Sequence, residues 1–77
     1  MIIFSQHSLL KLKQREISKN AVRSVLISPD YKFPSYSDRF IAYKKFDKRY
    51  LKVIYKIEGG NIIVITQYWE SDPKLLK

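Results

Sequence analysis

Hydrophobic positions follow two different patterns along this chain. In residues 6–28 apolar residues recur at helical spacing, whereas residues 39–70 form three long runs rich in Ile, Val, Tyr and Phe. Helical spacing places residues i, i+3 and i+4 on one side, and β-branched and aromatic residues are typical of strands. The pattern predicts helices followed by a sheet, which is an α+β fold.

The first third of the chain is expected to hold a short strand and two helices. Residues 1–4 are apolar, and Ser5 can cap a helix over residues 6–16. Ser18 can cap a second helix, which the Ser28-Pro29 pair ends. The residues expected to face the core are Leu9, Leu10 and Leu12 in the first helix, and Val22, Val25 and Leu26 in the second.

The remainder is predicted to be mostly strand. Residues 29–38 contain two prolines and connect the helices to the sheet, with an edge strand around residues 31–33. Strands are expected at residues 39–46, 49–58 and 61–70, separated by the pairs Asp47-Lys48 and Gly59-Gly60. Gly-Gly favours a two-residue hairpin turn because both positions adopt positive φ without steric cost.

Two-residue turns would determine which strand residues share a face, because directly paired residues point to the same side. One face is then apolar and is expected to lie under the helices. Its members are Phe40, Ala42, Leu51, Val53, Tyr55, Ile57, Ile62, Val64, Thr66 and Tyr68, with Lys44 near the end. The other face is basic and aromatic, around Ile41, Ile54, Ile63 and Ile65. Its members are Arg39, Tyr43, Lys45, Tyr50, Lys52, Lys56, Gln67 and Trp69.

Charge indicates what this second face binds. The chain has 15 Lys and Arg against 7 Asp and Glu, a formal net charge of +8. Single-stranded nucleic acid binds such surfaces through phosphate contacts to cations and through stacking of bases on aromatic rings. RNA is therefore the expected partner, bound by Arg39, Tyr43, Lys45, Tyr50, Lys56, Gln67 and Trp69. The alternative is a lysine-rich solvent face without a ligand.

Composition excludes several other classes. The chain has no cysteine and one histidine, so neither a disulfide framework nor the usual zinc site is expected, and no metal or cofactor is implied. No stretch approaches the roughly 20 apolar residues that cross a bilayer. We expect no membrane association and a cytoplasmic location. With 77 residues, one domain over residues 1–77 is expected.

Four short segments resemble a known group of proteins. They are FSQH at residues 4–7, REIS at 15–18, RYLKVIY at 49–55 and VITQYW at 64–69. They are similar to small microbial domains related to BrnT and to the wider RelE/ParE toxin superfamily. The resemblance implies two helices on one face of a curved antiparallel sheet. It also implies metal-independent endoribonuclease activity on RNA, including ribosome-bound mRNA, and a cognate antitoxin protein.

The resemblance also implies five catalytic positions. The family's helix histidine falls on His7, its second basic position on Arg15, its sheet cations on Arg49 and Lys52, and its terminal-strand aromatic on Tyr68. In this scheme His7 is the acid or base. Arg15 and Lys52 stabilise the phosphate, and Tyr68 donates a proton or stacks on a base.

Two observations count against this scheme. The family usually has Arg where this chain has Lys11, and lysine cannot make a bidentate phosphate contact. The expected register places Lys52 and Tyr68 on opposite faces of the sheet. Two other functions therefore stay open: a non-catalytic nucleic-acid-binding module, and a toxin fold that acts by binding a protein. The oligomeric state is not indicated.

Overall fold

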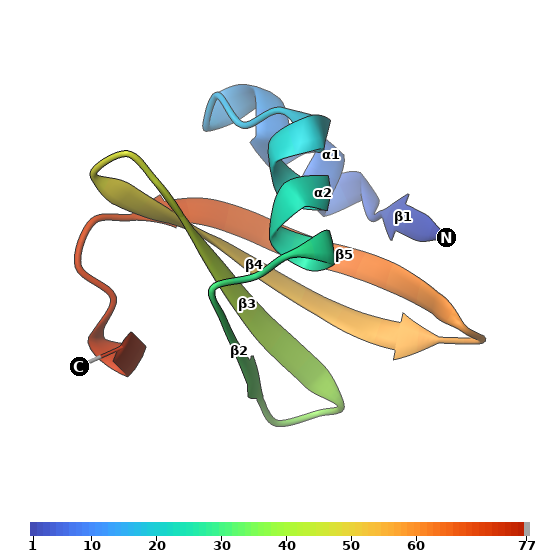
Figure 1. Cartoon of the computed structure of the whole chain (residues 1–77). Helices are drawn as coiled ribbons and strands as arrows, with labels where there is room; N and C mark the ends of the chain where they lie inside the picture. Colours follow the sequence, from blue (N-terminus) through green and yellow to red (C-terminus); the bar gives the residue numbers. More distant parts are fainter. Residues whose placement is uncertain (77) are drawn as a thin grey trace.

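The computed structural model describes residues 1–76 and has an α+β fold, in which two α-helices lie on one face of a five-stranded sheet (Figure 1). The elements are β1 (Ile2–Phe4), α1 (Gln6–Gln14), α2 (Lys19–Ile27), β2 (Tyr31–Pro34), β3 (Arg39–Phe46), β4 (Arg49–Glu58), β5 (Asn61–Glu70) and the short 3-10 helix η1 (Lys74–Leu76). The three long strands have the bounds that the sequence predicts.

The sheet is mixed rather than antiparallel throughout. Its strand order is β1-β5-β4-β3-β2, and β1 is parallel to β5 while the other pairs are antiparallel. The predicted α+β fold with an antiparallel sheet is confirmed over β2 to β5, and β1 adds one parallel pair at the edge. The physical reason is that β1 precedes both helices, and a long connection that includes helices is what allows two strands to pair in parallel.

Both α-helices begin at the predicted serine caps. The Ser5 hydroxyl accepts a hydrogen bond from the backbone N–H of Ser8, and the Ser18 hydroxyl accepts one from Ala21, each at 3.0 Å. Such bonds satisfy backbone donors that a helix leaves unpaired at its first turn. Helix α1 packs against β5, and α2 packs against β3 and β4. Both lie on the same side of the sheet (Figure 1).

The core lies between the helices and the sheet. Its buried members are Leu12, Ile17, Val22, Val25, Ala42, Leu51, Val53, Tyr55 and Val64. The expectation that Leu9 and Leu10 face the core was wrong, because their side chains are 43% and 58% exposed. Helix α1 instead turns Ser8 toward the sheet. The Ser8 hydroxyl donates to Gln67 Oε1 at 2.6 Å, and Gln67 Nε2 donates back to the Ser8 carbonyl at 3.0 Å.

The two hairpin turns have the predicted length. Phe46 pairs with Arg49, and Glu58 pairs with Asn61, so each turn has two residues. Gly59 and Gly60 have φ of 59° and 79°, which glycine adopts without strain. The turns therefore set the register at both ends of β4.

The register between β4 and β5 changes once, at Ile65. Ile54 pairs with Thr66 while its neighbour Tyr55 pairs with Val64, so Ile65 has no partner on β4. One extra residue reverses the side to which every later residue of the strand points. The predicted faces were therefore wrong for residues 66–69. Thr66 and Tyr68 lie on the face that carries Lys52, and Gln67 and Trp69 lie under the helices.

Candidate nucleic-acid interface and reaction site

The face of the sheet opposite the two α-helices carries the candidate site, and we call it the Lys52 face. By register, its members on the long strands are Arg39, Ile41, Tyr43, Lys45, Tyr50, Lys52, Ile54, Lys56, Glu58, Asn61, Ile63, Thr66, Tyr68 and Glu70. Edge strand β2 adds Tyr31 and Phe33. Beyond β5 the chain turns to the side away from the helices (Figure 1), and Pro73 there is buried.

A group of aromatic rings occupies one end of this face. Tyr43 lies at its centre, with the rings of Phe33 and Tyr50 edge-on at 6.3 Å and 6.2 Å between centroids. The Tyr31 ring lies 6.4 Å from that of Tyr50. Tyr43 is fully buried, whereas Tyr31 is 46% exposed and Tyr50 is partly exposed. The rings with surface for a base are thus Tyr31 and Tyr50, while Tyr43 supports them.

Lys52 lies next to this group, between two tyrosines that pair with it directly. Its register partners are Tyr43 on β3 and Tyr68 on β5. The Lys52 Nζ atom is 5.2 Å from the Tyr68 ring centroid and 3.7 Å from Glu70 Oε1. The Tyr43 hydroxyl donates to the same Glu70 oxygen at 3.4 Å. The Lys52 side chain is only 14% exposed, so neighbouring protein groups, more than water, determine how strongly its positive charge is stabilised.

Arg15 reaches the same position from the end of α1. Its Nη1 atom donates to the Gln67 carbonyl at 2.8 Å and to Thr66 Oγ1 at 3.3 Å. Its guanidinium carbon lies 5.6 Å from the Tyr68 ring centroid. We refer to Arg15, Tyr43, Lys52, Tyr68 and Glu70 as the Lys52 cluster. It combines two cations, two phenols and one carboxylate.

The cluster keeps Lys52 protonated. Burial lowers the pKa of Lys52, but hydrogen bonding to Tyr68 and the interactions with Tyr43 outweigh it, so the pKa is raised above its ordinary value. Burial raises the pKa of Tyr43, and this effect exceeds the opposing one of Lys52. At neutral pH Lys52 is therefore a fixed positive charge rather than a proton acceptor, and Tyr43 is a neutral donor.

These shifts predict how stability depends on pH. Both pKa values are higher in the folded than in the unfolded chain, so the folded state binds these protons more tightly. The stability they contribute is fully present below pH about 10 and is lost as the pH rises through the folded values. The free energy of unfolding, measured with urea, should therefore decline less steeply between neutral pH and pH about 11 in the double variant Lys52→Met, Tyr43→Phe than in the unchanged protein. An unchanged decline would contradict this coupling.

The predicted catalytic residues are only partly brought together. Arg15, Lys52 and Tyr68 meet in the Lys52 cluster, because the bulge at Ile65 turns Tyr68 toward Lys52. His7 is exposed on α1 and makes no hydrogen bond or ion pair within residues 1–76. Arg49 stacks on Trp69 at 3.8 Å, on the helix-covered side of the sheet.

The predicted binding residues also divide between the faces. Arg39 and Lys45 are exposed on the Lys52 face, where Lys45 Nζ lies 5.9 Å from the Tyr50 ring centroid. Lys56 is on the same face and forms an ion pair with Glu58 at 3.0 Å. The expectation that Gln67 and Trp69 join them was wrong, since the bulge turns both toward the helices. Gln67 is fully buried there.

Sequence reasoning missed Glu70. Its carboxylate forms an ion pair with Lys52, but it shares the Lys52 face only because of the bulge, which pairs it with Tyr50. With an uninterrupted register it would point to the helix side. The alternation of polar and apolar residues alone therefore could not place it.

Residues 1–76 hold neither a cluster of metal ligands nor a helix that could span a membrane. These residues contain no group of three or more His, Asp or Glu side chains that could hold a metal ion. In the same range, no helix has the length and apolar character needed to cross a membrane.

The fold and the cluster define a small basic α+β domain whose sheet carries a lysine between two tyrosines. This chain belongs to a family described as a domain of unknown function, DUF4258, whose model matches residues 4–69. The matched range contains both α-helices, the bulge and every member of the Lys52 cluster except Glu70. No curated protein and no solved structure matches the chain.

Proposed function

We propose that this protein binds single-stranded RNA on the Lys52 face and cleaves it by metal-independent transphosphorylation at the Lys52 cluster. The observation that carries the proposal is the meeting of Lys52, Tyr68 and Glu70 beside Arg15. These groups include a carboxylate that can accept a proton, a phenol that can donate one, and two cations that can stabilise a phosphate. All lie on a face with accessible lysines and tyrosine rings.

The reaction follows from the chemistry of these groups. The Glu70 carboxylate accepts the proton of the ribose 2′-hydroxyl, and the 2′-oxygen forms a bond to phosphorus. Lys52 and Arg15 stabilise the negative charge of the phosphorane. The bond to the 5′-oxygen breaks, and that oxygen takes the Tyr68 proton. The products are a 2′,3′-cyclic phosphate and a 5′-hydroxyl, and proton transfer through solvent from Glu70 to Tyr68 restores the site.

Cleavage of end-labelled single-stranded RNA in the presence of EDTA tests this function. The expected products carry a 2′,3′-cyclic phosphate, and DNA of the same sequence should be bound but not cut because it lacks the 2′-hydroxyl. Absence of RNA cleavage by folded protein, or equal cleavage of the DNA, would overturn the proposed reaction.

A second candidate function is a non-catalytic RNA-binding module. The observation that favours it is the ion pair of Lys52 with Glu70, which partly neutralises the cation that a phosphate would meet. This function accounts for the exposed lysines and tyrosines without a reaction. Binding of RNA and DNA without cleavage of either would support it.

Binding on the Lys52 face should depend strongly on salt. Each phosphate neutralised in a single strand contributes a slope of about −0.7 to a log-log plot of affinity against salt. Changing Lys45, Lys52 and Lys56 together to Ala should flatten the slope by roughly two units. A matched triple on the helices, Lys13→Ala, Lys19→Ala and Arg23→Ala, removes the same charge and should change the slope by less than about one unit. Equal slopes for both triples would place RNA elsewhere.

We also propose a biological setting from the resemblance of residues 4–18 and 49–69. In this setting the protein is a toxin related to BrnT and to RelE/ParE, acts on RNA in the cytoplasm, and is neutralised by a cognate antitoxin protein. Induced expression in bacteria should then stop growth, and Lys52→Met should relieve the arrest. Arrest that persists with Lys52→Met would separate the toxicity from the Lys52 cluster.

A further inference from the structure

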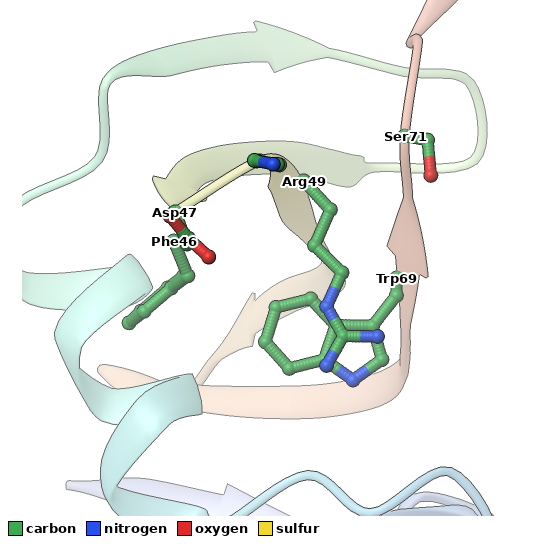
Figure 2. A pocket seen from close by; sticks show the side chains of 6 residues that line it. Phe46, Asp47, Arg49, Trp69 and Ser71 are labelled. Atoms are coloured by element: carbon green, nitrogen blue, oxygen red, sulfur yellow. The ribbon is translucent and has the colours of Figure 1, made fainter.

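A second site lies at the end of the sheet where β3 turns into β4. The turn residues Phe46 to Arg49, together with Trp69 and Ser71, surround a pocket of about 510 Å³ (Figure 2). Ligand pockets in proteins typically measure roughly 300–1,000 Å³. This pocket is therefore large enough for one nucleotide.

Arg49 and Trp69 form a fixed stack in the pocket. The guanidinium carbon lies 3.8 Å from the indole centroid, and Figure 2 shows the guanidinium lying flat over the ring. The Phe46 ring meets the indole edge-on at 5.9 Å and 86°, which holds the indole in place. Arg49 is exposed and has no carboxylate partner within 4.0 Å in residues 1–76. The outer face and N–H edges of its guanidinium are free to stack on a base and to bind phosphate.

The pocket residue Trp69 has a buried hydrogen-bond donor that is unpaired within the described part of the chain. The Trp69 Nε1 atom is inaccessible to solvent and has no acceptor within residues 1–76. A buried donor without a partner costs about 1–3 kcal/mol, and such groups are usually paired. A ligand oxygen or ring nitrogen that reaches the indole edge would supply the missing acceptor.

The remaining lining groups favour a nucleotide over a simple anion or an apolar ligand. Lys48 adds a second cation for phosphate, and the Asp47 carboxylate can accept hydrogen bonds from base N–H groups. Asp47 has φ of 62°, the left-handed conformation that two-residue hairpin turns require and that Asp tolerates better than most non-glycine residues. Aromatic stacking, two cations and one carboxylate are the complement of a base joined to a phosphate.

We propose that the Arg49–Trp69 pocket binds one nucleotide, whether free or as part of a single-stranded RNA. Trp69 follows Tyr68 directly on β5, and the two side chains point to opposite faces. The pocket and the Lys52 cluster thus lie back to back at the same end of the β4–β5 pair. If the protein cleaves RNA as proposed, this pocket holds a nucleotide away from the scissile bond, and that part of the inference rests on the proposed function.

The single tryptophan makes the test direct, because Trp69 is the only one in the chain. Trp fluorescence of the full chain is titrated with the four nucleoside 5′-monophosphates, and with ribose 5-phosphate and inorganic phosphate as ligands without a base. At least one nucleotide should give a saturable change, and the ligands without a base should bind at least about tenfold more weakly. A short RNA with the preferred base should compete with that nucleotide.

Variants locate the binding. Arg49→Ala and Arg49→Lys should each weaken nucleotide binding at least about tenfold, since lysine keeps the charge but loses the stack. Lys13→Ala, a change of the same charge on α1, should leave it unchanged. The Lys52→Met variant should bind nucleotide normally even if it cuts no RNA. A failure of the proposed reaction can therefore be distinguished from a failure of the proposed nucleotide pocket. No response to any nucleotide, an equal response to phosphate, or full binding by folded Arg49→Lys would overturn the proposal.

Discussion

Lys52→Met is expected to lower the rate of RNA cleavage by a factor of about 10²–10³, which is the usual cost of removing one electrostatic contact to a transition state. Lys52 is 14% exposed, lies 3.7 Å from Glu70 and has a raised pKa, so its charge is held in place before RNA binds. A preorganised charge stabilises the phosphorane more than the ground-state phosphate. RNA affinity should therefore fall much less than the rate.

Two matched variants make this result specific. Lys56→Met removes the same charge from the same strand and face, four residues away, and should change the cleavage rate only a few-fold because Lys56 is paired with Glu58 at the surface. His7→Ala should also retain most of the activity, since no hydrogen bond or ion pair joins His7 to the Lys52 cluster within residues 1–76.

Two results would contradict the expected effects of His7→Ala and Lys52→Met. A hundredfold loss in His7→Ala with an unchanged melting temperature would give His7 the proton-transfer role that the family resemblance implies. Full activity in folded Lys52→Met would remove the Lys52 cluster from the mechanism. Purified variants assayed for cleavage and melting in one buffer distinguish these cases.

Gln67→Leu is expected to lower the free energy of unfolding by about 2 kcal/mol, and the melting temperature by about 10 °C for a domain of this size. Gln67 is fully buried, and its amide makes both hydrogen bonds of the Ser8 pair. The leucine side chain leaves the buried Ser8 hydroxyl without its acceptor. Calorimetry or urea unfolding of the variant measures the loss.

The double variant tests the reason for the loss. Ser8→Ala combined with Gln67→Leu removes both partners of the Ser8 Oγ–Gln67 Oε1 hydrogen bond, and replacing such a buried pair by apolar groups of similar shape is often nearly neutral. The Ser8 carbonyl, which accepts from Gln67 Nε2, loses that donor equally in the single Gln67→Leu variant and in the double variant. The double variant should therefore be more stable than Gln67→Leu alone, with a coupling of about 1 kcal/mol or more. Gln14→Leu, an exposed change on α1, should alter stability by less than about 0.5 kcal/mol. Additive losses in the cycle would show that the pair does not act as a unit.

The Ser8–Gln67 pair forms in the register that the bulge produces. Residues 62–65 read Ile-Ile-Val-Ile, so shifting this strand by one residue leaves an apolar side chain on either face. The alternation that normally defines register is absent there. Beyond residue 65 the two registers do differ, because the observed one brings Gln67 to Ser8 under the helices, packs Trp69 against Phe46 and places Glu70 beside Lys52.

Local chemistry of the sequence determined the elements of this protein. Ser5 and Ser18 cap the helices, Gly59 and Gly60 make the turn with positive φ, and the β-branched and aromatic runs define three strands at their observed bounds. Each of these outcomes depends on residues a few positions apart, and short-range preferences act in any tertiary setting. The basic charge was readable from composition, and Arg15, Lys52 and Tyr68 were candidates because the family resemblance implied them.

Tertiary structure alone decided which of these residues meet. The unpaired Ile65 turns Tyr68 and Glu70 toward Lys52 and sends Trp69 to the pocket with Arg49, and nothing in the local pattern of residues 62–65 marks it. The register that follows it is the one in which Gln67 bonds to Ser8, 59 residues earlier in the chain. A contact over that separation contributes only when helix and sheet pack together. For this reason the composition of the candidate site became defined only with the packed fold.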